Sequence, residues 1–492
     1  MPPRPVIHWF RQDLRLADNP ALTAAASGDR PVVPLYVLDD AAAGDWAPGG
    51  ASRWWLAGSL DALGRALDKA GCRLVLRRGR TVDTLTQIAA ETGAEAIHFT
   101  RAYEPWAAQL EIDLKAACDK AGLGLHRHAG ALLQEPEALR TKAGEPFRVF
   151  TPFWRTLQEQ GPARSHLLAP ARITPPAKPP KSDKLETWGL LPTRPDWAGG
   201  LRETWTPGEA GARERLSDFV DGAMARYADA RDRPHQPATS MLSPHLHFGE
   251  VSPVQCWQAA REATAEDRGG KRGAESFLRE VAWREFSYHL LHHWPDLPEK
   301  PFRADFASFP WDTDTRRRKA RLRAWQRGET GYPIVDAGIR QLWQTGWMHN
   351  RVRLITASFL TKHLLVPWQE GERWFWDTLV DADLANNSAS WQWVAGSGAD
   401  AAPYFRIFNP VLQGEKFDPD GDYVRHFVPE LAKLPASLIH APWKVPVAEL
   451  SRHGVRLGSD YPKPIVDHAE ARATALAAFA TLRPGTAVPS EP

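Results

Sequence analysis

The stretch VIHWFRQDLRLADNPALTAAASGDRPVVPLYVL (residues 6–38) begins and ends with a short apolar run rich in β-branched residues. Similar runs recur at residues 73–79, 96–100 and 123–128, and amphipathic patterns such as that of residues 52–71 separate them. This alternation is typical of βαβ units, in which helices cover both faces of a parallel sheet. We therefore predict that residues 1–135 form an α/β domain around a parallel five-stranded, Rossmann-like sheet.

The turn after the first of these runs lacks the glycines of a dinucleotide-binding fold. Residues 11–16 read RQDLRL where a GxGxxG sequence would stand. An ordinary Rossmann dinucleotide site is therefore not expected in this domain.

The remainder of the chain divides by composition. Residues 136–205 include a proline-rich stretch that disfavours regular helix, so we predict an irregular connector there. A period of 3.6 residues dominates from 206 to 482, which predicts an all-α C-terminal domain. Residues 483–492 would form a short tail. The helical patterns cover residues 208–230, 252–265, 274–294, 332–346, 350–364, 370–380 and 468–482.

Composition narrows the class of protein. The chain has 492 residues, 43% of them apolar and 24% charged, which suits a globular protein of two or three domains. Its 3 cysteines lie far apart, so neither a disulfide framework nor a cysteine-ligated metal is expected. We found no signal-peptide h-region and no membrane-spanning apolar run, and therefore expect a cytoplasmic protein. A net charge of +2 is too small to identify a nucleic-acid partner.

The segment DADLANNSASWQWVAGSGADAAPYFRIFNP (381–410) combines acids, amides, an arginine and two tryptophans without a clean helix or strand period. The whole chain has 22 Trp but only 8 Tyr, although Tyr is the easier aromatic residue to place at a partly wet surface. The segment therefore predicts a binding site that uses indole rings.

A second group of polar and aromatic residues follows one face of the pattern at 274–294. Phe277, Glu280, Trp283, Arg284 and Ser287 recur at steps of three and four residues. A surface ion pair between Glu280 and Arg284 is the plain interpretation. An indole in the same stripe favours recognition of a planar polar ligand instead.

Three further features have two interpretations each. Thr239, Ser240 and Ser243 lie in a Pro-flanked turn that either holds phosphate oxygens or caps a helix. The His289, His292 and His293 cluster has no carboxylate at metal-ligand spacing, so packing is preferred and no metal is predicted. The basic run RRRKARLR (316–323) is interpreted as a solvated helix face.

Six separated motifs resemble the photolyase/cryptochrome family, and within it the microbial photolyases that repair cyclobutane pyrimidine dimers. They occur in the family's order and cover essentially the whole chain. They are WFRQDLRLADNPAL (9–22), TSMLSPHLHFGEVSP (239–253), LREVAWREF (278–286), TGYPIVDAGIRQL with TGWMHNRVR (330–353), DADLANN with WQWVAGSGADAAPYFRIFNP (381–410), and YPKPIVDHAEAR (461–472).

The resemblance implies that the helical domain binds FAD. Arg353 and Asp381 would pair beside the flavin ring, and Asn387 would face its N5, where plant cryptochromes carry an acid. Phe277 stands where relatives often have Trp. The FAD-binding residues implied are Tyr227, Thr239, Ser240, Met241, Leu242, Ser243, Phe277, Glu280, Arg284, Asn350, Arg353, Asp381, Ala382, Asp383 and Asn387.

The resemblance also implies contacts to UV-damaged DNA. The dimer would be flipped out of the duplex and stacked on indole rings, while basic residues contact phosphates. The implied residues are Arg231, Glu280, Trp283, Arg284, Asn350, Arg351, Trp393, Arg406 and Lys416.

By the same resemblance, excited reduced FAD would donate an electron to the dimer, and a relay of Trp391, Trp368 and Trp311 would keep the flavin reduced. Trp311 departs from the family's spacing, because the gap to Trp325 is about four residues longer than in close relatives. A second, antenna chromophore is expected, with a reduced folate preferred to an 8-hydroxy-deazaflavin. Trp54, Trp55, Glu104 and Trp106 would frame it.

Two alternatives stay open. A cryptochrome-like photoreceptor usually carries a long polar C-terminal extension, whereas only residues 483–492 follow the last helical pattern here. A (6-4) photolyase would be expected to have His in place of Asn350. We expect a monomer that binds damaged DNA and requires neither a membrane nor a protein partner.

Overall fold

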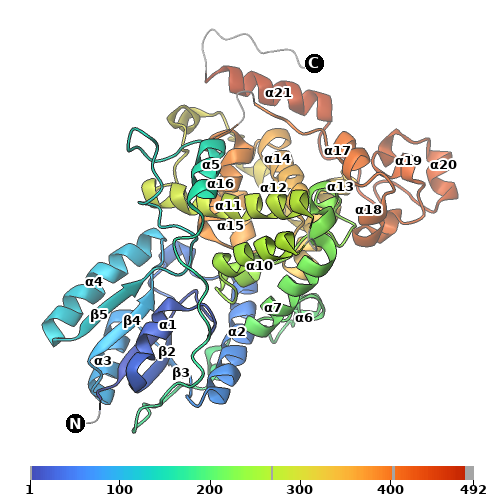
Figure 1. The fold of residues 1–492 in the computed structure, drawn as a ribbon. Coiled ribbons are helices and arrows are strands. Elements are labelled where there is room, and N and C mark those ends of the chain that lie inside the picture. Colours follow the sequence, from blue (N-terminus) through green and yellow to red (C-terminus); the bar gives the residue numbers. More distant parts are fainter. Residues whose placement is uncertain (1–2, 267–269, 402–404, 483–492) are drawn as a thin grey trace. The chain divides into compact units, whose positions relative to one another are not determined.

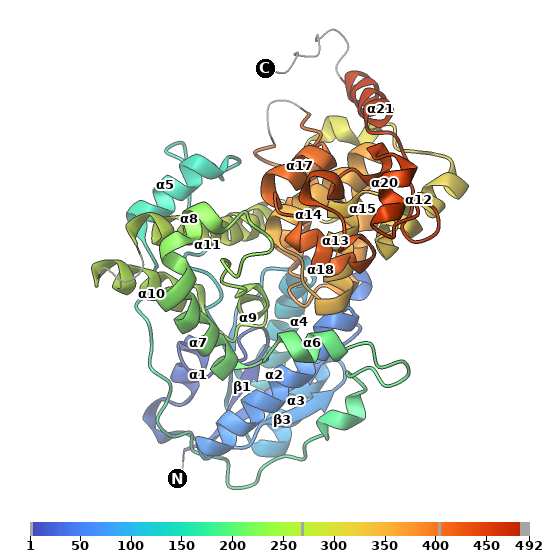
Figure 2. The ribbon, with the colours of Figure 1, turned by 90° about the vertical axis from the view of Figure 1, so that its right-hand side faces the viewer.

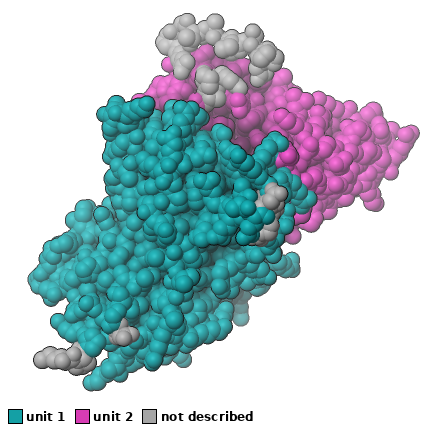
Figure 3. Space-filling model, in the orientation of Figure 1, with its two compact units in different colours: residues 1–228, 239–295, 380–385 teal, residues 229–238, 296–379, 386–492 magenta. Residues whose placement is uncertain are grey.

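The computed structural model describes residues 3–266, 270–401 and 405–482, apart from the side chain of Asp29. These residues form two compact units, coloured separately in Figure 3. Unit 1 contains residues 1–228, 239–295 and 380–385, and unit 2 contains residues 229–238, 296–379 and 386–492. The tail expected at 483–492 lies outside the described residues.

Unit 1 begins with the predicted sheet. Its five strands are all parallel and lie in the order β3-β2-β1-β4-β5, which confirms the fold class expected for residues 1–135. The strands are β1 (Val6–Phe10), β2 (Val32–Leu38), β3 (Val75–Arg78), β4 (Ala96–Thr100) and β5 (Gly124–His128).

Helices cover both faces of this sheet. Helices α3 (Thr81–Thr92) and α4 (Pro105–Ala121) pack on one face, where their apolar side chains meet those of β1, β2, β3 and β4. Helix α1 (Pro20–Ala25) contacts β1, β4 and β5 from the other side, and α2 (Gly50–Lys69) connects β2 to β3. Figure 1 shows these helices flanking the strands.

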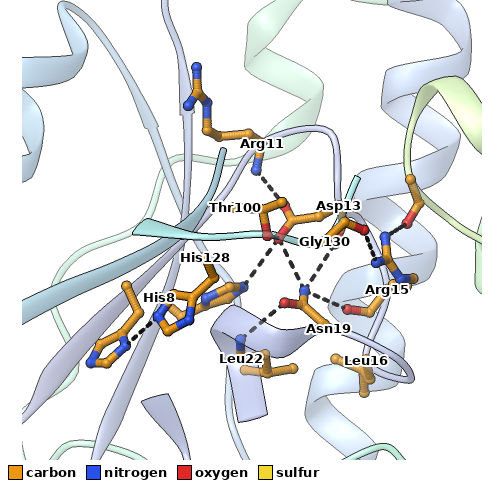
Figure 4. Close-up of polar contacts among 12 residues, drawn as sticks. His8, Arg11, Asp13, Arg15, Leu16, Asn19, Leu22, Thr100, His128 and Gly130 are labelled. Carbon is orange, nitrogen blue, oxygen red and sulfur yellow. Dashed lines mark hydrogen bonds and ion pairs between the residues drawn. The ribbon is translucent and has the colours of Figure 1, made fainter. Parts of the chain in front are cut away.

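The RQDLRL turn after β1 is a buried polar network (Figure 4). The Asp13 carboxylate accepts hydrogen bonds from the Arg11 main-chain N–H at 2.8 Å and the Thr100 hydroxyl at 2.7 Å. Arg15 donates to the carbonyl oxygens of Asp18, Gly130 and Gly249. The turn therefore fixes the carboxyl ends of β1 and β4 against the helical part of unit 1.

Gly249 is required by this packing. Its φ is +67°, and a Cβ there would lie 2.0 Å from the Gln12 carbonyl oxygen. Only glycine permits that approach.

The helical part of unit 1 consists of short segments around α11 (Lys271–His293). The helix α10 (Pro253–Ala265) packs against α11, as does α5 (Phe150–Gln160). The other helices of unit 1 are α6 (Gly199–Thr204), α7 (Glu209–Asp218) and α9 (Ser243–His247), and α8 (Tyr227–Ala230) lies at its boundary.

Among the described residues of unit 2, all regular secondary structure is helical apart from one isolated bridge, which agrees with the expected all-α domain. At its centre, α13 (Pro333–Thr345) packs against four other helices (Figure 2). These are α12 (Thr315–Arg327), α14 (Asn350–Ser358), α17 (Pro410–Phe417) and α18 (Asp422–Phe427). The remaining helices are α15 (Trp368–Thr378), α16 (Leu384–Ala395), α19 (Ala436–Ile439), α20 (Val447–Arg452) and α21 (His468–Ala480).

Two segments are more regular than their sequences predicted. The connector at 136–205 contains α5, whose Phe150, Phe153, Trp154 and Leu157 are buried on one face. The segment 381–410 contains α16. None of the described helices has the length and apolar character needed to cross a membrane.

Candidate functional site

Asp383 carries a buried negative charge in unit 1, at the start of α16. Its carboxylate accepts a hydrogen bond from the Tyr288 hydroxyl of α11, and His247 Nδ1 lies 3.7 Å away at the end of α9. Both Asp383 and Tyr288 are buried. Tyr288 is 95 residues from Asp383 in sequence, and His247 is farther still.

The surroundings of Asp383 keep it ionised. Burial raises the pKa of this carboxyl. His247, Arg284 and the Tyr288 hydroxyl lower it by more than burial raises it, so its pKa is well below the ordinary value. Burial and the neighbouring carboxylate raise the pKa of Tyr288, so its hydroxyl keeps its proton and donates.

Arg284 lies beside this group rather than on an open surface. Its guanidinium donates to the Ala131 carbonyl oxygen at 3.0 Å and lies over the Tyr288 ring at 4.7 Å. It is 3.4 Å from Glu285, and the surface ion pair with Glu280, the plain interpretation of the sequence, does not form. Arg284 therefore lies against Tyr288 and Glu285 within unit 1, and its contacts to a cofactor or to DNA stay predictions.

An aromatic wall lies near the start of α11. Phe277 packs against Phe219 with 4.8 Å between ring centroids, and Tyr227 meets Phe277 edge-on at 6.1 Å. Both predicted flavin-site residues, Tyr227 and Phe277, are thus brought together in one buried cluster. Glu280 is half-buried on the next turn of the helix.

The predicted phosphate-binding turn offers free hydroxyl groups. Thr239 and Ser240 are half-buried, and no hydrogen bond among the described residues uses either hydroxyl. Met241 adopts a φ of +48°, which is uncommon for a residue with a side chain and marks a tightly constrained turn. Leu242 is buried and Ser243 exposed. Polar groups of this kind fit the ribose and phosphates of a dinucleotide.

One face of the Trp283 indole is covered by a neighbouring aromatic ring. Phe150 of α5 stacks on the indole with ring centroids 3.7 Å apart and planes 6° from parallel. Phe286 meets the same indole edge-on at 5.8 Å. Trp283 itself is half-buried, so the connector helix holds an indole that is partly accessible.

A small cavity lies at the carboxyl ends of β1 and β4, the point where strand order reverses in this sheet. It adjoins the Asp383 group, because His247, Arg284 and Tyr288 line it. The other lining residues are Arg11, Gln12, Thr100, Arg101, Ala102, Tyr103 and Ala131.

The tryptophans expected to frame an antenna chromophore are placed differently. Trp55 is fully buried, contacts Trp205 and Phe248, and donates its Nε1–H to Glu250 at 3.0 Å. Trp54 is buried beside it. The expectation that Trp55 frames a ligand is wrong, because its ring is part of the core. Trp106 is half-exposed.

In unit 2, a hydrogen bond to Glu372 fixes the side chain of Asn387. Its amide Nδ2 donates to the Glu372 main-chain carbonyl at 3.0 Å, and the Ser388 hydroxyl donates to the Glu372 carboxylate at 2.5 Å. Burial raises the pKa of Glu372 to about 8, although the Ser388 hydrogen bond lowers it. The Asn387 side chain is thereby fixed in orientation by the main chain of Glu372, whose own carboxyl is mostly protonated at neutral pH.

The predicted relay residues all lie in unit 2. Trp391 is buried, and its rings contact Phe375 and Trp325 with centroids 4.9 and 6.2 Å away. A Cβ on Gly371 would lie 2.2 Å from the Trp391 indole, so α15 packs directly on it. Trp368 is one turn before Gly371 on the same face of α15.

Trp311 is half-buried and contacts Phe309 at 4.4 Å. Among the described residues, no direct ring contact joins it to Trp368 or Trp391. Its place at the outer end of the relay stays a prediction.

Basic and polar residues expected to contact DNA occupy several segments of unit 2. Asn350 is exposed at the first position of α14. Arg351 is 2.7 Å from Asp232 and lies over the Phe417 ring at 4.4 Å. Trp393 is half-buried and donates its Nε1–H to the Asp400 carbonyl oxygen at 3.1 Å. Lys416 and Arg406 are exposed, and Arg231 is half-buried.

Two of the expected flavin residues belong to different units. Arg353 donates its Nε–H to the Met348 carbonyl oxygen in unit 2 at 2.7 Å. Asp381 and Ala382 are buried in unit 1. The ion pair expected between Arg353 and Asp381 stays a prediction.

The histidines of α11 pack against the connector. The Phe147 main-chain N–H donates to His289 Nε2 at 3.0 Å, and His292 lies 3.2 Å from Glu137. Within the described ranges, no group of three or more His, Cys, Asp or Glu side chains is arranged to hold a metal.

Three residues that contact predicted site residues within their own unit were not assigned a role from sequence. Tyr288 is four residues after Arg284, so extending the helix stripe by one turn finds it. His247 stands in the quoted SPHLHFGE motif, and its approach to Asp383 depends on tertiary structure. Glu372 gave no signal, because a glutamate in an amphipathic helix is ordinarily exposed.

Comparison with known families and proteins adds a second line of observation. A family model for DNA photolyase matches residues 6–177, and a model for the FAD binding domain of DNA photolyase matches residues 277–481. Together the two matches include the sheet of unit 1, α11 from Phe277 onward, and nearly all of the described unit 2.

Individual proteins resemble the chain over nearly its whole length. A deoxyribodipyrimidine photo-lyase of Agrobacterium fabrum strain C58 is 52% identical over 98% of this chain and 99% of its own length. Cryptochrome-2 of Arabidopsis thaliana is 38% identical over 95% of this chain and 77% of its own length. The crystal structure of a bacterial class III photolyase from Agrobacterium tumefaciens has a TM-score of 0.94 and 51% identity, and the match covers 98% of both chains.

Proposed function

Because this chain belongs to the photolyase/cryptochrome family, we propose that it repairs cyclobutane pyrimidine dimers in DNA with the energy of light. The observation that carries the proposal is the 52% identity to a deoxyribodipyrimidine photo-lyase over 482 residues. The enzyme is a carbon–carbon lyase that binds FAD. Reduced FAD, when bound and excited by blue light, supplies the electron that opens the cyclobutane ring and takes it back afterwards.

The residues of unit 1 fit the cofactor. The Thr239 and Ser240 hydroxyls are available to ribose or phosphate oxygens, and Phe277 and Tyr227 offer an aromatic wall. Asp383 contributes a permanent negative charge, and the hydrogen bond from Tyr288 holds its carboxylate in one orientation, with His247 Nδ1 3.7 Å away. This group binds and orients the cofactor.

Asn387 is the residue of unit 2 that favours repair over signalling. An amide can hydrogen-bond a reduced flavin without placing a second negative charge beside it. The hydrogen bond to Glu372 fixes which end of the amide points away from the helix α15. The alternative function is that of a cryptochrome-like photoreceptor. It is supported by the 38% identity between this chain and cryptochrome-2 of Arabidopsis thaliana.

Two indoles would contact the lesion. A dimer within duplex DNA must be flipped out to reach the flavin, as in other enzymes of this family. Trp283 and Trp393 offer half-exposed rings, each already fixed by a neighbour, namely Phe150 and the Asp400 carbonyl. Rigid aromatic surfaces bind the rings of the dimer with little loss of side-chain entropy.

The other lesion contacts divide by chemistry. Glu280 and Asn350 offer hydrogen-bonding groups for the pyrimidine edges, whereas Arg231, Arg351, Arg406 and Lys416 contact phosphates. Arg284 serves the cofactor more directly than DNA, because its guanidinium lies over Tyr288.

Trp391, Trp368 and Trp311 would return the flavin to its reduced state by passing an electron inward from the surface. Trp391 and Trp368 are buried and Trp311 is half-buried, which is the gradient of exposure that such a relay requires. The route needs no direct ring contact, because electrons tunnel between separated aromatic rings.

A second chromophore is part of the proposal. A reduced folate is preferred and an 8-hydroxy-deazaflavin is the alternative. An absorption band in the near ultraviolet beyond that of flavin, together with mass spectrometry of the released chromophore, distinguishes the two. We further propose a cytoplasmic monomer that joins the nucleoid when it binds DNA, and size-exclusion chromatography with light scattering tests the monomer.

Lesion specificity tests the proposed function. Purified protein with reduced flavin is illuminated with one oligonucleotide that contains a cyclobutane thymine dimer and another that contains a (6-4) photoproduct. The proposal requires light-dependent loss of the dimer. Repair of the (6-4) product in its place would contradict it, as would loss of neither lesion.

A further inference from the structure

Four exposed cations form a line along α12. Arg316, Lys319, Arg323 and Arg327 follow one another at steps of three, four and four residues, which places them on one face of the helix. We refer to these four residues as the basic stripe. Among the described residues, none of the four forms an ion pair with an acid.

The acids near α12 neutralise only its other side. Asp312 accepts two hydrogen bonds from Arg317, at 2.8 and 2.6 Å, and one from Arg321 at 3.3 Å. Arg318 pairs with Glu370 at 3.3 Å. Three of the seven cations of the helix are therefore compensated, and the basic stripe is not.

The helix holds the basic stripe outward. Trp325, fully buried, anchors α12 and donates its Nε1–H to the Thr356 carbonyl oxygen at 3.0 Å. Arg316 is nine residues before Trp325, or half a turn out of phase, and so faces the opposite direction. Because the helix backbone is already ordered, cations on α12 lose less conformational entropy on binding than the same cations on a loop would lose.

The N-terminal end of α12 joins the region of unit 2 that carries Arg406. Asp312 donates its main-chain N–H to Leu365, and Trp311 packs on Phe309. Phe309 in turn contacts Phe405 at 5.9 Å, the residue directly before Arg406. The segment that leads into α12 thus packs against Phe405, the neighbour in sequence of Arg406, to which the proposed function assigns a phosphate contact.

We propose that the basic stripe binds the phosphate backbone of the DNA that flanks the lesion. The inference rests on the proposed function, which makes DNA the partner. The first and last of the four residues are eleven residues apart, or about 16 Å of helix, and duplex DNA carries one phosphate charge for roughly every 1.7 Å of its axis. A line of cations complements such a polyanion, and it contributes affinity without sequence preference.

The test measures the salt dependence of binding to undamaged duplex. In the variant R316Q/K319Q/R323Q/R327Q, glutamine keeps the helix propensity and removes four charges. Each lost phosphate contact makes the slope of log K against log salt shallower by about 0.9. We expect the slope of the variant to be shallower by about three to four, with weaker binding at low salt.

The matched control removes the same charge elsewhere. Arg172, Lys178, Lys181 and Lys184 are exposed in the connector of unit 1, and R172Q/K178Q/K181Q/K184Q should keep the wild-type slope. A change smaller than about one in the stripe variant overturns the proposal, as does an equal change in the control. Melting temperature and flavin absorbance confirm that both variants are folded.

Duplex length provides a second readout. Wild-type protein should bind more weakly to a duplex that covers only the lesion and its nearest neighbours than to one extended beyond a helical turn on each side. The stripe variant should lose most of this difference, and a full difference in the variant would contradict the proposal. If the wild-type protein repairs dimers but the stripe variant keeps the wild-type salt slope and length dependence, the proposed function stands and the proposal for the basic stripe is overturned. If the slope changes as expected but the wild-type protein repairs no dimer, the basic stripe binds DNA and the proposed function is overturned.

Discussion

The side-chain amide of Asn387 donates a hydrogen bond to the main-chain carbonyl of Glu372 at 3.0 Å, and the residue after Asn387 binds the Glu372 carboxylate. One glutamate therefore supports two consecutive residues at the start of α16. Its second carboxylate oxygen is buried without a hydrogen-bond partner among the described residues. The position of the proposed flavin contact depends on this acid.

Glu372 should make stability depend on pH. Burial raises the pKa of its carboxyl from 4.5 to about 8, so its contribution to stability is full below pH 4.5 and falls as the pH approaches 8. The slope in this window is about 1.4 kcal/mol per pH unit. Urea unfolding across the window should show that Glu372→Gln lacks this component, while Glu415→Gln, at an exposed position, retains it. A variant with the wild-type slope would refute the assignment.

Asn387→Asp should impair repair while FAD stays bound. A carboxylate beside the reduced flavin adds an unfavourable like charge, so repair should fall by at least about tenfold and the flavin midpoint potential should become more negative. Spectroelectrochemistry and repair kinetics measure the two effects. Asn386→Asp makes the same change one residue earlier and should have the smaller effect; equal effects would argue against a special position for Asn387.

Trp391→Phe should block the return of oxidised flavin to its reduced form under light. The change removes the indole but keeps an aromatic ring in the pocket beside Phe375. The photoreduction rate with an external reductant should drop at least about tenfold. Trp154→Phe changes a buried tryptophan of unit 1, and the flavin of this control variant should be photoreduced at the wild-type rate. If Trp391→Phe is also photoreduced at the normal rate, the relay starts elsewhere.

Phe150→Leu should weaken discrimination between dimer and undamaged DNA. The stacked pair with Trp283 is worth about 1 kcal/mol, so the ratio of the two affinities should fall roughly fivefold. Phe153 lies on the same helix and contacts Phe286 but not Trp283. Phe153→Leu therefore tests for general loss of core packing, and an identical loss of discrimination in both variants would remove the special role of Phe150.

The sheet could be predicted because its signal is local. Buried parallel strands are continuous apolar runs, and the runs at residues 6–10 and 32–38 became β1 and β2 at the expected positions. The long helices, such as α11, have the 3.6-residue period that comes from burying one face. Both patterns result from burial of consecutive elements and need no knowledge of distant contacts.

The site could be predicted only in part, since its contacts are distant in sequence. The motif residues were identified by resemblance, and Asp383 was among them, but the sequence did not predict its hydrogen bond with Tyr288 or its proximity to His247. The connector was expected to be irregular because prolines dominate its second half, whereas Phe150 and Phe153 make the earlier α5 amphipathic. Trp55 resembled a ligand contact by residue type, yet its neighbours Trp205 and Phe248 make it core.

The central claim is tested most directly by light-dependent splitting of a thymine dimer. Protein with reduced flavin is mixed with a dimer-containing oligonucleotide, and one half is exposed to blue light while the other stays in the dark. The account predicts that thymine absorbance returns only in the illuminated half, in an amount that grows with the light absorbed. Unchanged absorbance in the light, or equal recovery in the dark, would contradict it.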